Sequence, residues 1–197
     1  NTDINTALEK SISNNIDEVI ELIRKVDKFI DNQDFSNILK ELSKNFLLIK
    51  DRKNISFETK NIENCTLKYS NTLSLDDGYK IPEENEEVLM AYLLYIITKK
   101  IQRRFNFLSK NREIKVELLD YISKSRDFFH IMYKFLQEKV MIKYVVELIS
   151  EKLSSMEIDS NLSLEKARKI IRAGQKKAKE MNLAAVFAVV TSEGNLI

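Results

Sequence analysis

The sequence predicts an all-α protein, an up-and-down helical bundle, followed by a short piece of a different domain. Two observations predict the bundle: apolar residues recur every three or four positions along most of residues 7–153, and the 197-residue chain has only three glycines and one proline. We expect about five helices in the first domain, residues 1–155, because bundles alternate long helices with short loops. A short β-like insertion is expected within it.

Two amphipathic helices are predicted at the start of the chain. The first spans residues 7–30, and the second starts near Asp34, whose carboxylate can cap it, and runs to Ile49. Because the connection between them is short, the two helices are expected to pack antiparallel. Their apolar stripes comprise Leu8, Ile12, Ile16, Val19, Ile20, Ile23, Val26, Ile30, Phe35, Ile38, Leu39, Leu42 and Phe46.

The pattern changes between Asp51 and Pro82. Apolar residues there alternate with polar ones at period two, as in Cys65, Leu67 and Tyr69, among many Asn, Ser and Asp residues. Alternation at period two is typical of a half-buried strand. This stretch is therefore predicted to form short strands or an ordered loop, the β-like insertion of the bundle.

Two further helical segments complete the predicted bundle. Pro82 is followed by four glutamates within five residues, an arrangement typical of a helix start, and this helix is expected to run to about Ser109. Apolar residues from Glu113 to Leu153 again have helical spacing, with no glycine or proline among them. This last segment is predicted to form either one helix or two.

The chain changes character behind the bundle. Residues 156–162 are polar and predict a linker, and Ser163 can cap a helix that Asn182 ends. A nearly continuous apolar strand, 184–191, then leads through a Ser-Glu-Gly-Asn turn into a return strand. A hairpin with one short strand cannot complete a sheet by itself, so residues 163–197 are expected to open an incomplete α/β domain.

Composition excludes several classes of protein. The 32 Lys and Arg residues are balanced by 30 Asp and Glu residues and interspersed with them, so no nucleic-acid partner is expected. Three glycines cannot form a Gly-rich phosphate loop. No apolar run approaches the ~20 residues of a membrane span. A single cysteine, Cys65, permits no internal disulfide, and we expect a cytoplasmic protein without membrane attachment.

The C-terminal segment carries a first resemblance to a known family. Its residues are Ser-Leu-Glu-Lys-Ala-Arg-Lys-Ile-Ile from Ser163, then Asn182-Leu183, Ala188-Val189-Val190 and Glu193-Gly194-Asn195-Leu196-Ile197. They resemble the start of the GlcG/HbpS-like domain. In one group of proteins this domain follows a corrinoid adenosyltransferase of the PduO type, and the order of bundle and C-terminal segment here is similar.

The bundle itself resembles PduO-type cob(I)alamin adenosyltransferases over residues 16–138, as a diverged and degenerate member. The run Tyr79-Lys80-Ile81-Pro82 is similar to the family's aromatic and Leu-Pro-Gly-Gly turn, with glutamates at the two glycines. On the following helix, two family arginines and a glutamate correspond to Tyr95, Lys99 and Gln102, followed by a matching Arg103-Arg104.

Two more segments carry the same resemblance. The run Tyr121-Ile122-Ser123-Lys124-Ser125-Arg126-Asp127 is similar to the Tyr-Leu-Asn-Arg-Leu-Ser-Asp pattern of the family's last helix, with Ser123 at the Asn and Asp127 at the Asp. Asp17-Glu18, on the first helix, resembles a further family Asp-Glu pair. The region before the Leu-Pro turn is helical in the family, whereas the β-like stretch occupies it here.

The resemblance implies a reaction, its ligands and an assembly. In the family, the reduced cobalt of cob(I)alamin attacks the 5′ carbon of Mg-bound ATP, and triphosphate leaves. The family's sites lie between subunits, which implies a homotrimer. Carried over by position, the catalytic residues would be Asp17, Lys99 and Asp127, and the residues that contact ATP or cobalamin would be Tyr79, Tyr95, Gln102, Arg103 and Ser123.

Each candidate also has a purely structural interpretation. The basic residues within 99–104 could bind a triphosphate, or they could form a solvated helix face that pairs with nearby acids. Asp127 could be an active-site acid or a partner in a surface ion pair. Tyr79 could face a corrin or pack beneath the turn. His130, the only histidine, is expected in a structural or surface role, and Cys65 is not expected to be a nucleophile.

Two functions from different classes remain open. In the first, the chain is a diverged ATP:cob(I)alamin adenosyltransferase of cobalamin-dependent diol or ethanolamine metabolism. In the second, the bundle is a non-catalytic module that binds corrinoid or haem, or docks into a microcompartment, and the replaced hallmark residues favour this view. A third interpretation, an unrelated helical adaptor, would be favoured by a monomer without a cleft at Tyr95 and Lys99.

Overall fold

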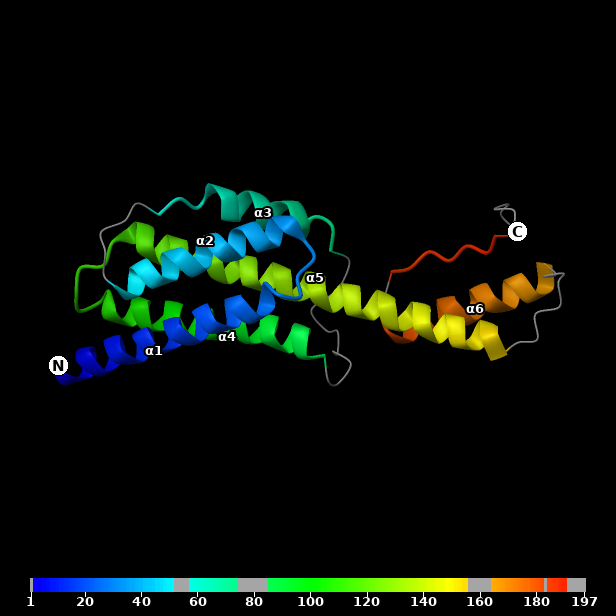
Figure 1. The fold of residues 1–197 in the computed structure, drawn as a ribbon, viewed down its shortest axis with the longest axis horizontal. Coiled ribbons are helices and arrows are strands. Elements are labelled where there is room, and N and C mark those ends of the chain that lie inside the picture. Colours follow the sequence, from blue (N-terminus) through cyan, green and yellow to red (C-terminus); the bar gives the residue numbers. More distant parts are fainter. Residues whose placement is uncertain (1, 52–56, 74–84, 156–163, 183, 191–197) are drawn as a thin grey trace. The chain divides into compact units, whose positions relative to one another are not determined.

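The computed structural model describes residues 2–51, 57–73, 85–155, 164–182 and 184–190. Within these ranges the chain forms helices and no strand, which confirms the predicted all-α bundle (Figure 1). The helices are α1 (Thr2–Val26), α2 (Gln33–Lys50), α3 (Lys60–Ser70), α4 (Glu86–Leu108), α5 (Val116–Ser155) and α6 (Leu164–Glu180). No helix in the described part of the chain is both long and apolar enough to cross a membrane.

The chain divides into two compact units. The first comprises residues 1–72 and 84–136, and the second comprises residues 73–83 and 137–197. The division falls inside α5, whose C-terminal part groups with α6. The boundary predicted at residue 155 stays a prediction, and the predicted linker lies outside the described residues.

The long helices of the first unit form the up-and-down bundle. α1 packs against both α2 and α4. α5 contacts α2, where the rings of Phe128 and Phe35 lie 5.7 Å apart, and it contacts α4, where Arg126 is hydrogen-bonded to Gln102. α2 and α4 therefore each lie between α1 and α5. Figure 1 shows α1 and α2 running antiparallel, as their short connection predicts.

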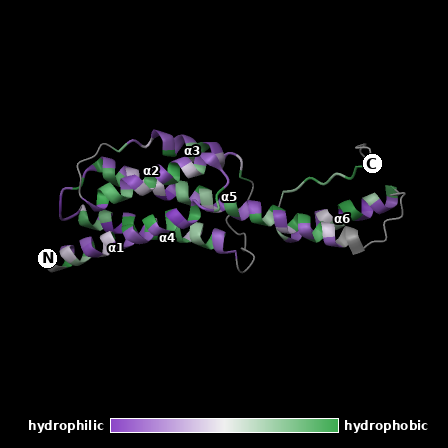
Figure 2. Cartoon of the chain, in the orientation of Figure 1, coloured by the Kyte–Doolittle hydropathy of each residue, from purple (hydrophilic) through white to green (hydrophobic). Residues whose placement is uncertain are grey.

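The predicted apolar stripes form the core of this unit. Figure 2 shows green and purple residues alternating along each helix, as expected for amphipathic helices with one buried face. Fully burying one Ile, Leu or Phe side chain stabilises the fold by about 1.5–3 kcal/mol. The largest fully buried side chains of the unit are Tyr121, Phe35, Phe46, Phe128, Phe129, Ile16, Ile23, Leu39, Leu42, Ile62, Leu94 and Ile101.

The predicted β-like insertion is wrong for residues 60–70, which form α3. The period-two pattern placed Leu67 on the same face as Cys65, but Leu67 is 63% exposed. The competing helical spacing prevails because it buries Ile62 and Cys65 together and brings Tyr69 to 4.4 Å from Phe35, ring to ring. α3 thus packs against α2.

Two predicted helix starts also differ from the structure. Asn32, and not Asp34, caps α2: its side-chain oxygen accepts a hydrogen bond from the backbone N–H of Phe35, and Asp34 lies in the first turn. α4 begins at Glu86, with Asn85 as its cap. Both asparagines have the extended backbone of a cap residue, which leaves the side chain free to reach the third N–H of the helix. Pro82 and Ser163 lie outside the described residues.

Within the described residues of the second unit, α6 has the predicted helical form, and residues 184–190 do not form the predicted strand. Residues 184–190 form neither helix nor strand, apart from an isolated bridge at Val190. A strand requires a neighbour to supply its hydrogen bonds, and the described residues contain no such neighbour. The ring of Phe187 instead lies against α6 at Gly174, where an added Cβ would be only 2.9 Å from it. The predicted turn and return strand lie outside the described residues.

Candidate functional site

Several of the predicted site residues lie where α4 contacts α5. We define the α4–α5 seam as Tyr95, Lys99 and Gln102 of α4 with Arg126, Asp127 and His130 of α5. The α4 residues are spaced by four and three positions, so they share one face of that helix. Arg126 and Asp127 precede His130 by four and three positions, so these residues likewise share one face of α5.

The polar part of the seam is centred on Arg126. Its Nη1 donates a hydrogen bond of 2.7 Å to Oε1 of Gln102 across the two helices. Its Nε and Nη2 donate to Oδ1 of the adjacent Asp127 at 3.0 and 2.5 Å. The guanidinium therefore holds one acid and one amide in place, and the carboxylate of Asp127 compensates its charge.

The aromatic part of the seam lies one turn away. The rings of Tyr95 and His130 are stacked, with centroids 4.7 Å apart and planes inclined by 26°. Tyr92 lies 5.1 Å from Tyr133 and 6.3 Å from Tyr95, again between ring centroids. Burial, followed by the proximity of Tyr92, raises the pKa of Tyr133 above its ordinary value. These four rings form a partly exposed aromatic surface shared by the two helices.

Lys99 lies between the polar and aromatic parts. Its Nζ is 3.3 Å from the hydroxyl oxygen of Tyr95 and 5.4 Å from the centroid of that ring. The side chain is half-buried, and within the described ranges no carboxylate pairs with it. A cation over an aromatic face is attracted by the ring quadrupole, and it keeps its charge available to an anion.

The other basic residues within 99–104 do not act as one cluster. Arg103 is exposed, whereas Arg104 turns toward α1 and donates to Oδ1 of Asn15 and to the backbone oxygen of Ser11. Successive residues on a helix point in directions about 100° apart, which separates these two arginines. Ser123 is partly exposed on α5.

Asp17 lies at a different seam of the bundle. Lys50 of α2 donates to both of its carboxylate oxygens, at 2.6 and 2.7 Å. This ion pair joins α1 to α2, whereas Lys99 and Asp127 lie between α4 and α5. Within one chain the structure therefore brings together Tyr95, Lys99, Gln102 and Asp127 without Asp17. Tyr79 lies outside the described residues.

The structure also places the single cysteine, for which no catalytic role is proposed. Cys65 is buried, and burial, followed by the charge of Asp34, raises the pKa of its thiol to about 11. A protonated, buried thiol is a poor nucleophile, in agreement with the sequence-based expectation. The described residues include no group of three His, Cys, Asp or Glu side chains that could hold a metal ion.

Sequence reasoning missed two members of the seam. Arg126 was expected only as a neighbour of Asp127, yet it is the residue that links α5 to α4. His130 is expected in a structural or surface role, and nothing in the sequence indicates its stacking on Tyr95. The available signal was periodicity, because residues 123, 126, 127 and 130 share one helical face. The partner face on α4 could not be deduced from α5 alone.

Comparisons with known proteins show a similarity of fold. The sequence matches no protein-family model and no curated protein. The fold is similar to solved structures of PduO-type ATP:corrinoid adenosyltransferase variants from Lactobacillus reuteri, two complexed with cobalamin and ATP and one with ATP.

The similarity extends over the larger part of both chains. The TM-scores are 0.54–0.55 at 16% sequence identity, over 66% of this chain and 78–82% of those chains. The chain therefore shares the fold of the PduO-type ATP:corrinoid adenosyltransferases.

Proposed function

We propose that the bundle is a diverged relative of the ATP:corrinoid adenosyltransferases and that it binds ATP and a corrinoid. The observation that carries this proposal is the half-buried ammonium of Lys99 at the α4–α5 seam, which contacts Tyr95 and has no carboxylate partner among the described residues. The similar fold of proteins complexed with ATP and cobalamin supports the same ligands.

The proposed reaction needs positive charge next to the leaving group. Adenosyl transfer forms a bond between cobalt and C5′ with the electron pair of the reduced metal, while the C5′–O bond breaks and triphosphate leaves with that bond's pair. Fixed cations stabilise the charge that develops on the triphosphate. Lys99 supplies one such cation at the seam, and Arg103, exposed one turn further along α4, supplies a second. Any Mg²⁺ would arrive with ATP.

The aromatic surface fits the second ligand. A corrin is large and flat, and planar macrocycles favour contact with aromatic rings. Tyr92, Tyr95, His130 and Tyr133 present such rings beside Lys99. The proposed roles are therefore phosphate contact for Lys99 and Arg103, corrin contact for the aromatic surface, and positioning for Gln102, Ser123 and Asp127.

The proposed site is completed by a second copy of the chain. Asp17 lies between α1 and α2, away from the α4–α5 seam of its own chain. A homotrimer with sites between subunits, as the family resemblance implies, would let Asp17 of one copy face the seam of another. Sedimentation of the full chain tests this arrangement, because a monomer at every concentration would leave Asp17 without a role at the site.

Calorimetric titration with ATP and a spectroscopic assay of adenosylcobalamin formation test the proposal together. We expect ATP binding in the micromolar to millimolar range, weakened about tenfold in Lys99→Met, which corresponds to about 1.4 kcal/mol. Lys44→Met, which removes an exposed lysine from α2, is the matched control and should bind ATP as the unaltered chain does. Absence of ATP binding, or equal binding by both variants, would contradict the proposal.

A second function, a non-catalytic binding module, is favoured by two observations. Arg126, a cation at the seam, is engaged by Asp127 and Gln102, and Tyr95 stands where the resembling family has an arginine. Such a bundle would hold a corrinoid or haem, or serve assembly in a microcompartment, without adenosyl transfer. Tight corrinoid binding with no turnover of ATP and reduced cobalamin would decide in favour of this module.

The proposal for the second unit rests on the sequence resemblance. We propose that residues 163–197 are the first part of a GlcG/HbpS-like domain, with α6 as its first helix. The pairing of the two domains supports a cytoplasmic role in cobalamin-dependent diol or ethanolamine metabolism. Growth on a diol or on ethanolamine after deletion of the gene in its host measures this role, and unchanged growth on both substrates would contradict it.

A further inference from the structure

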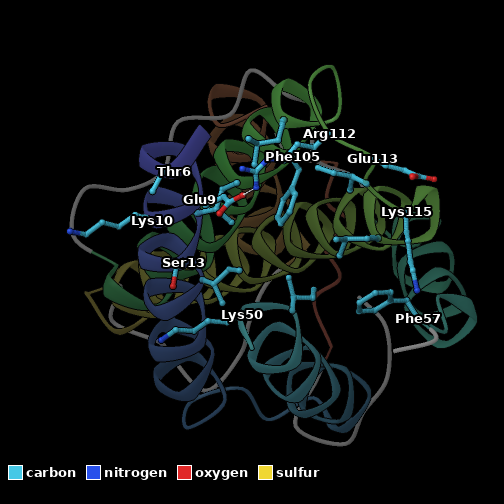
Figure 3. Close-up of a pocket in the computed structure, with 16 residues that line it drawn as sticks. Thr6, Glu9, Lys10, Ser13, Lys50, Phe57, Phe105, Arg112, Glu113 and Lys115 are labelled. Atoms are coloured by element: carbon cyan, nitrogen blue, oxygen red, sulfur yellow. Dashed lines mark hydrogen bonds and ion pairs between the residues drawn. The ribbon is translucent and has the colours of Figure 1, made fainter. Parts of the chain in front are cut away.

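A second concave site lies in the bundle, away from the α4–α5 seam. This site, the end pocket, has a volume of about 670 Å³ and lies between the first half of α1, the end of α2 and the connection from α4 to α5 (Figure 3). Pockets that bind small molecules commonly measure roughly 300–1,000 Å³. None of the residues that define the α4–α5 seam lines the end pocket.

The interior of the end pocket is apolar. Its lining includes Ile16 of α1, Ile49 of α2, Leu118 of α5 and the rings of Phe57 and Phe105. Both phenylalanines are only partly buried, although phenylalanine is among the residues most often fully buried. An apolar ligand would remove their exposed ring surface from water, which favours the complex.

The rim of the pocket carries charges of both signs. Its charged residues include four cations, Lys10, Lys50, Arg112 and Lys115, and two acids, Glu9 and Glu113. Lys50 is paired with Asp17, and Arg112 with Glu9. Figure 3 shows the guanidinium of Arg112 beside Phe105 and directed at the carboxylate of Glu9. Glu9 contacts one terminal nitrogen, and a guanidinium has five N–H donors in a planar fork. Arg112 can therefore bind a second anion next to an aromatic wall.

We propose that the end pocket binds a small amphiphile with an apolar body and a single anionic head group, such as a medium-chain carboxylate, with Arg112 as its anchor. The apolar interior accepts the body, and the N–H donors of Arg112 that Glu9 does not engage select an anion over a neutral or cationic head. Arg–carboxylate pairs are frequently bidentate, which also fixes the orientation of the ligand. The proposal is independent of the function assigned to the α4–α5 seam.

Methyl NMR of the full chain, labelled at isoleucine, tests the proposal with decanoate as the probe. We expect decanoate below about 1 mM to shift the methyl signals of Ile12, Ile16, Ile49 and Ile114, as a ligand of modest affinity would. Decyltrimethylammonium has a chain of the same length and the opposite charge. Its concentration should have to be at least about tenfold higher to produce the same shifts. The methyl signals of Ile142 and Ile170, in the second unit, should not move.

Three variants separate the head-group contact from general hydrophobic binding. Arg112→Met should weaken decanoate binding about tenfold, whereas Glu9→Gln, which removes the competing carboxylate, should strengthen it severalfold. Ser13→Phe, which places a ring in the pocket, should abolish the shifts. Arg24→Met, at an exposed position of α1 outside the pocket, is the matched control and should leave binding unchanged.

Several results would overturn the proposal. They are an absence of shifts at the pocket isoleucines, equal responses to the anionic and cationic probes, or shifts confined to the second unit. The same holds if Glu9→Gln and Arg112→Met change the affinity in the same direction. Shifts of the pocket isoleucines produced by ATP and not by decanoate would identify a nucleotide site instead.

Discussion

Arg126 of α5 donates a hydrogen bond of 2.7 Å to Gln102 of α4 and thereby joins the two helices that carry most of the candidate site. The same guanidinium is bound to Asp127, so its orientation is fixed from two sides. The arginine side chain is 28% exposed, which leaves its bonds only partly screened by water. Tyr95 and Lys99 lie on the same face of α4 as Gln102. The hydrogen bond between Gln102 and Arg126 therefore also positions these two residues relative to α5.

Replacing Gln102 with leucine should therefore destabilise the bundle. The variant loses the acceptor of the cross-helix bond, and we expect the free energy of unfolding to fall by about 1 kcal/mol. Urea denaturation followed by circular dichroism measures the change. The control is Lys100→Leu, at an exposed position of α4 near Gln102. It should change the free energy of unfolding by less than about 0.5 kcal/mol. Equal losses in the two variants would show that the hydrogen bond contributes nothing.

The buried hydroxyl of Tyr121 should make the fold sensitive to alkaline pH. Burial, the largest influence, raises the pKa of this phenol, and its hydroxyl accepts a 2.9 Å hydrogen bond from Asn45. Up to about pH 10, the pKa of an unfolded tyrosine, the phenol is neutral in both states. Above it, ionisation stabilises the unfolded chain, so the free energy of unfolding should fall as pH rises.

Comparison with Tyr121→Phe isolates this effect. The variant leaves Asn45 without its partner and should be less stable at neutral pH by about 1–2 kcal/mol. Its stability should then fall less steeply between pH 10 and 11 than that of the unaltered chain. Denaturant titrations at several pH values measure both slopes, and parallel slopes would rule out Tyr121 as the group responsible.

Thr98 offers a stabilising substitution. Its hydroxyl is fully buried in α4 and has no hydrogen-bond partner among the described residues. Thr98→Val has nearly the same shape without the desolvated hydroxyl, and it should raise the free energy of unfolding by about 1 kcal/mol. Thr66→Val is the control, because Thr66 donates a 2.7 Å bond to the backbone oxygen of Ile62 and should gain nothing. A destabilised Thr98→Val would mean that the hydroxyl has a partner.

The contact of Gly174 with Phe187 should suppress the usual benefit of alanine in a helix. Gly→Ala within a helix typically stabilises it by about 1 kcal/mol, but here the new Cβ would lie 2.9 Å from the ring. We expect this gain in the Phe187→Ala background and little or none in the unaltered chain. Hydrogen exchange of the α6 amides is measured in the unaltered chain, in Gly174→Ala, in Phe187→Ala and in the double variant. If Gly174→Ala had the same effect with and without Phe187, the contact would be refuted.

Much of the fold follows from local patterns. The stripes of α1, α2, α4 and α6 are predictable because each helix buries one face, and periodicity records that face directly. α3 was not predictable in this way, since its short sequence satisfies both period two and helical spacing. Burial of Ile62 and Cys65 against the bundle decides between them. The caps at Asn32 and Asn85 are local signals, yet several capping residues compete near each helix start.

The sequence by itself determined the helical bundle, its antiparallel opening pair and the face of α4 that carries Tyr95, Lys99 and Gln102. Only the tertiary structure decided that Arg126 is the partner of Gln102, and that Asp17 pairs with Lys50 at another seam. The physical reason is that periodicity specifies which face a helix buries, whereas the neighbour of that face depends on how all the helices pack.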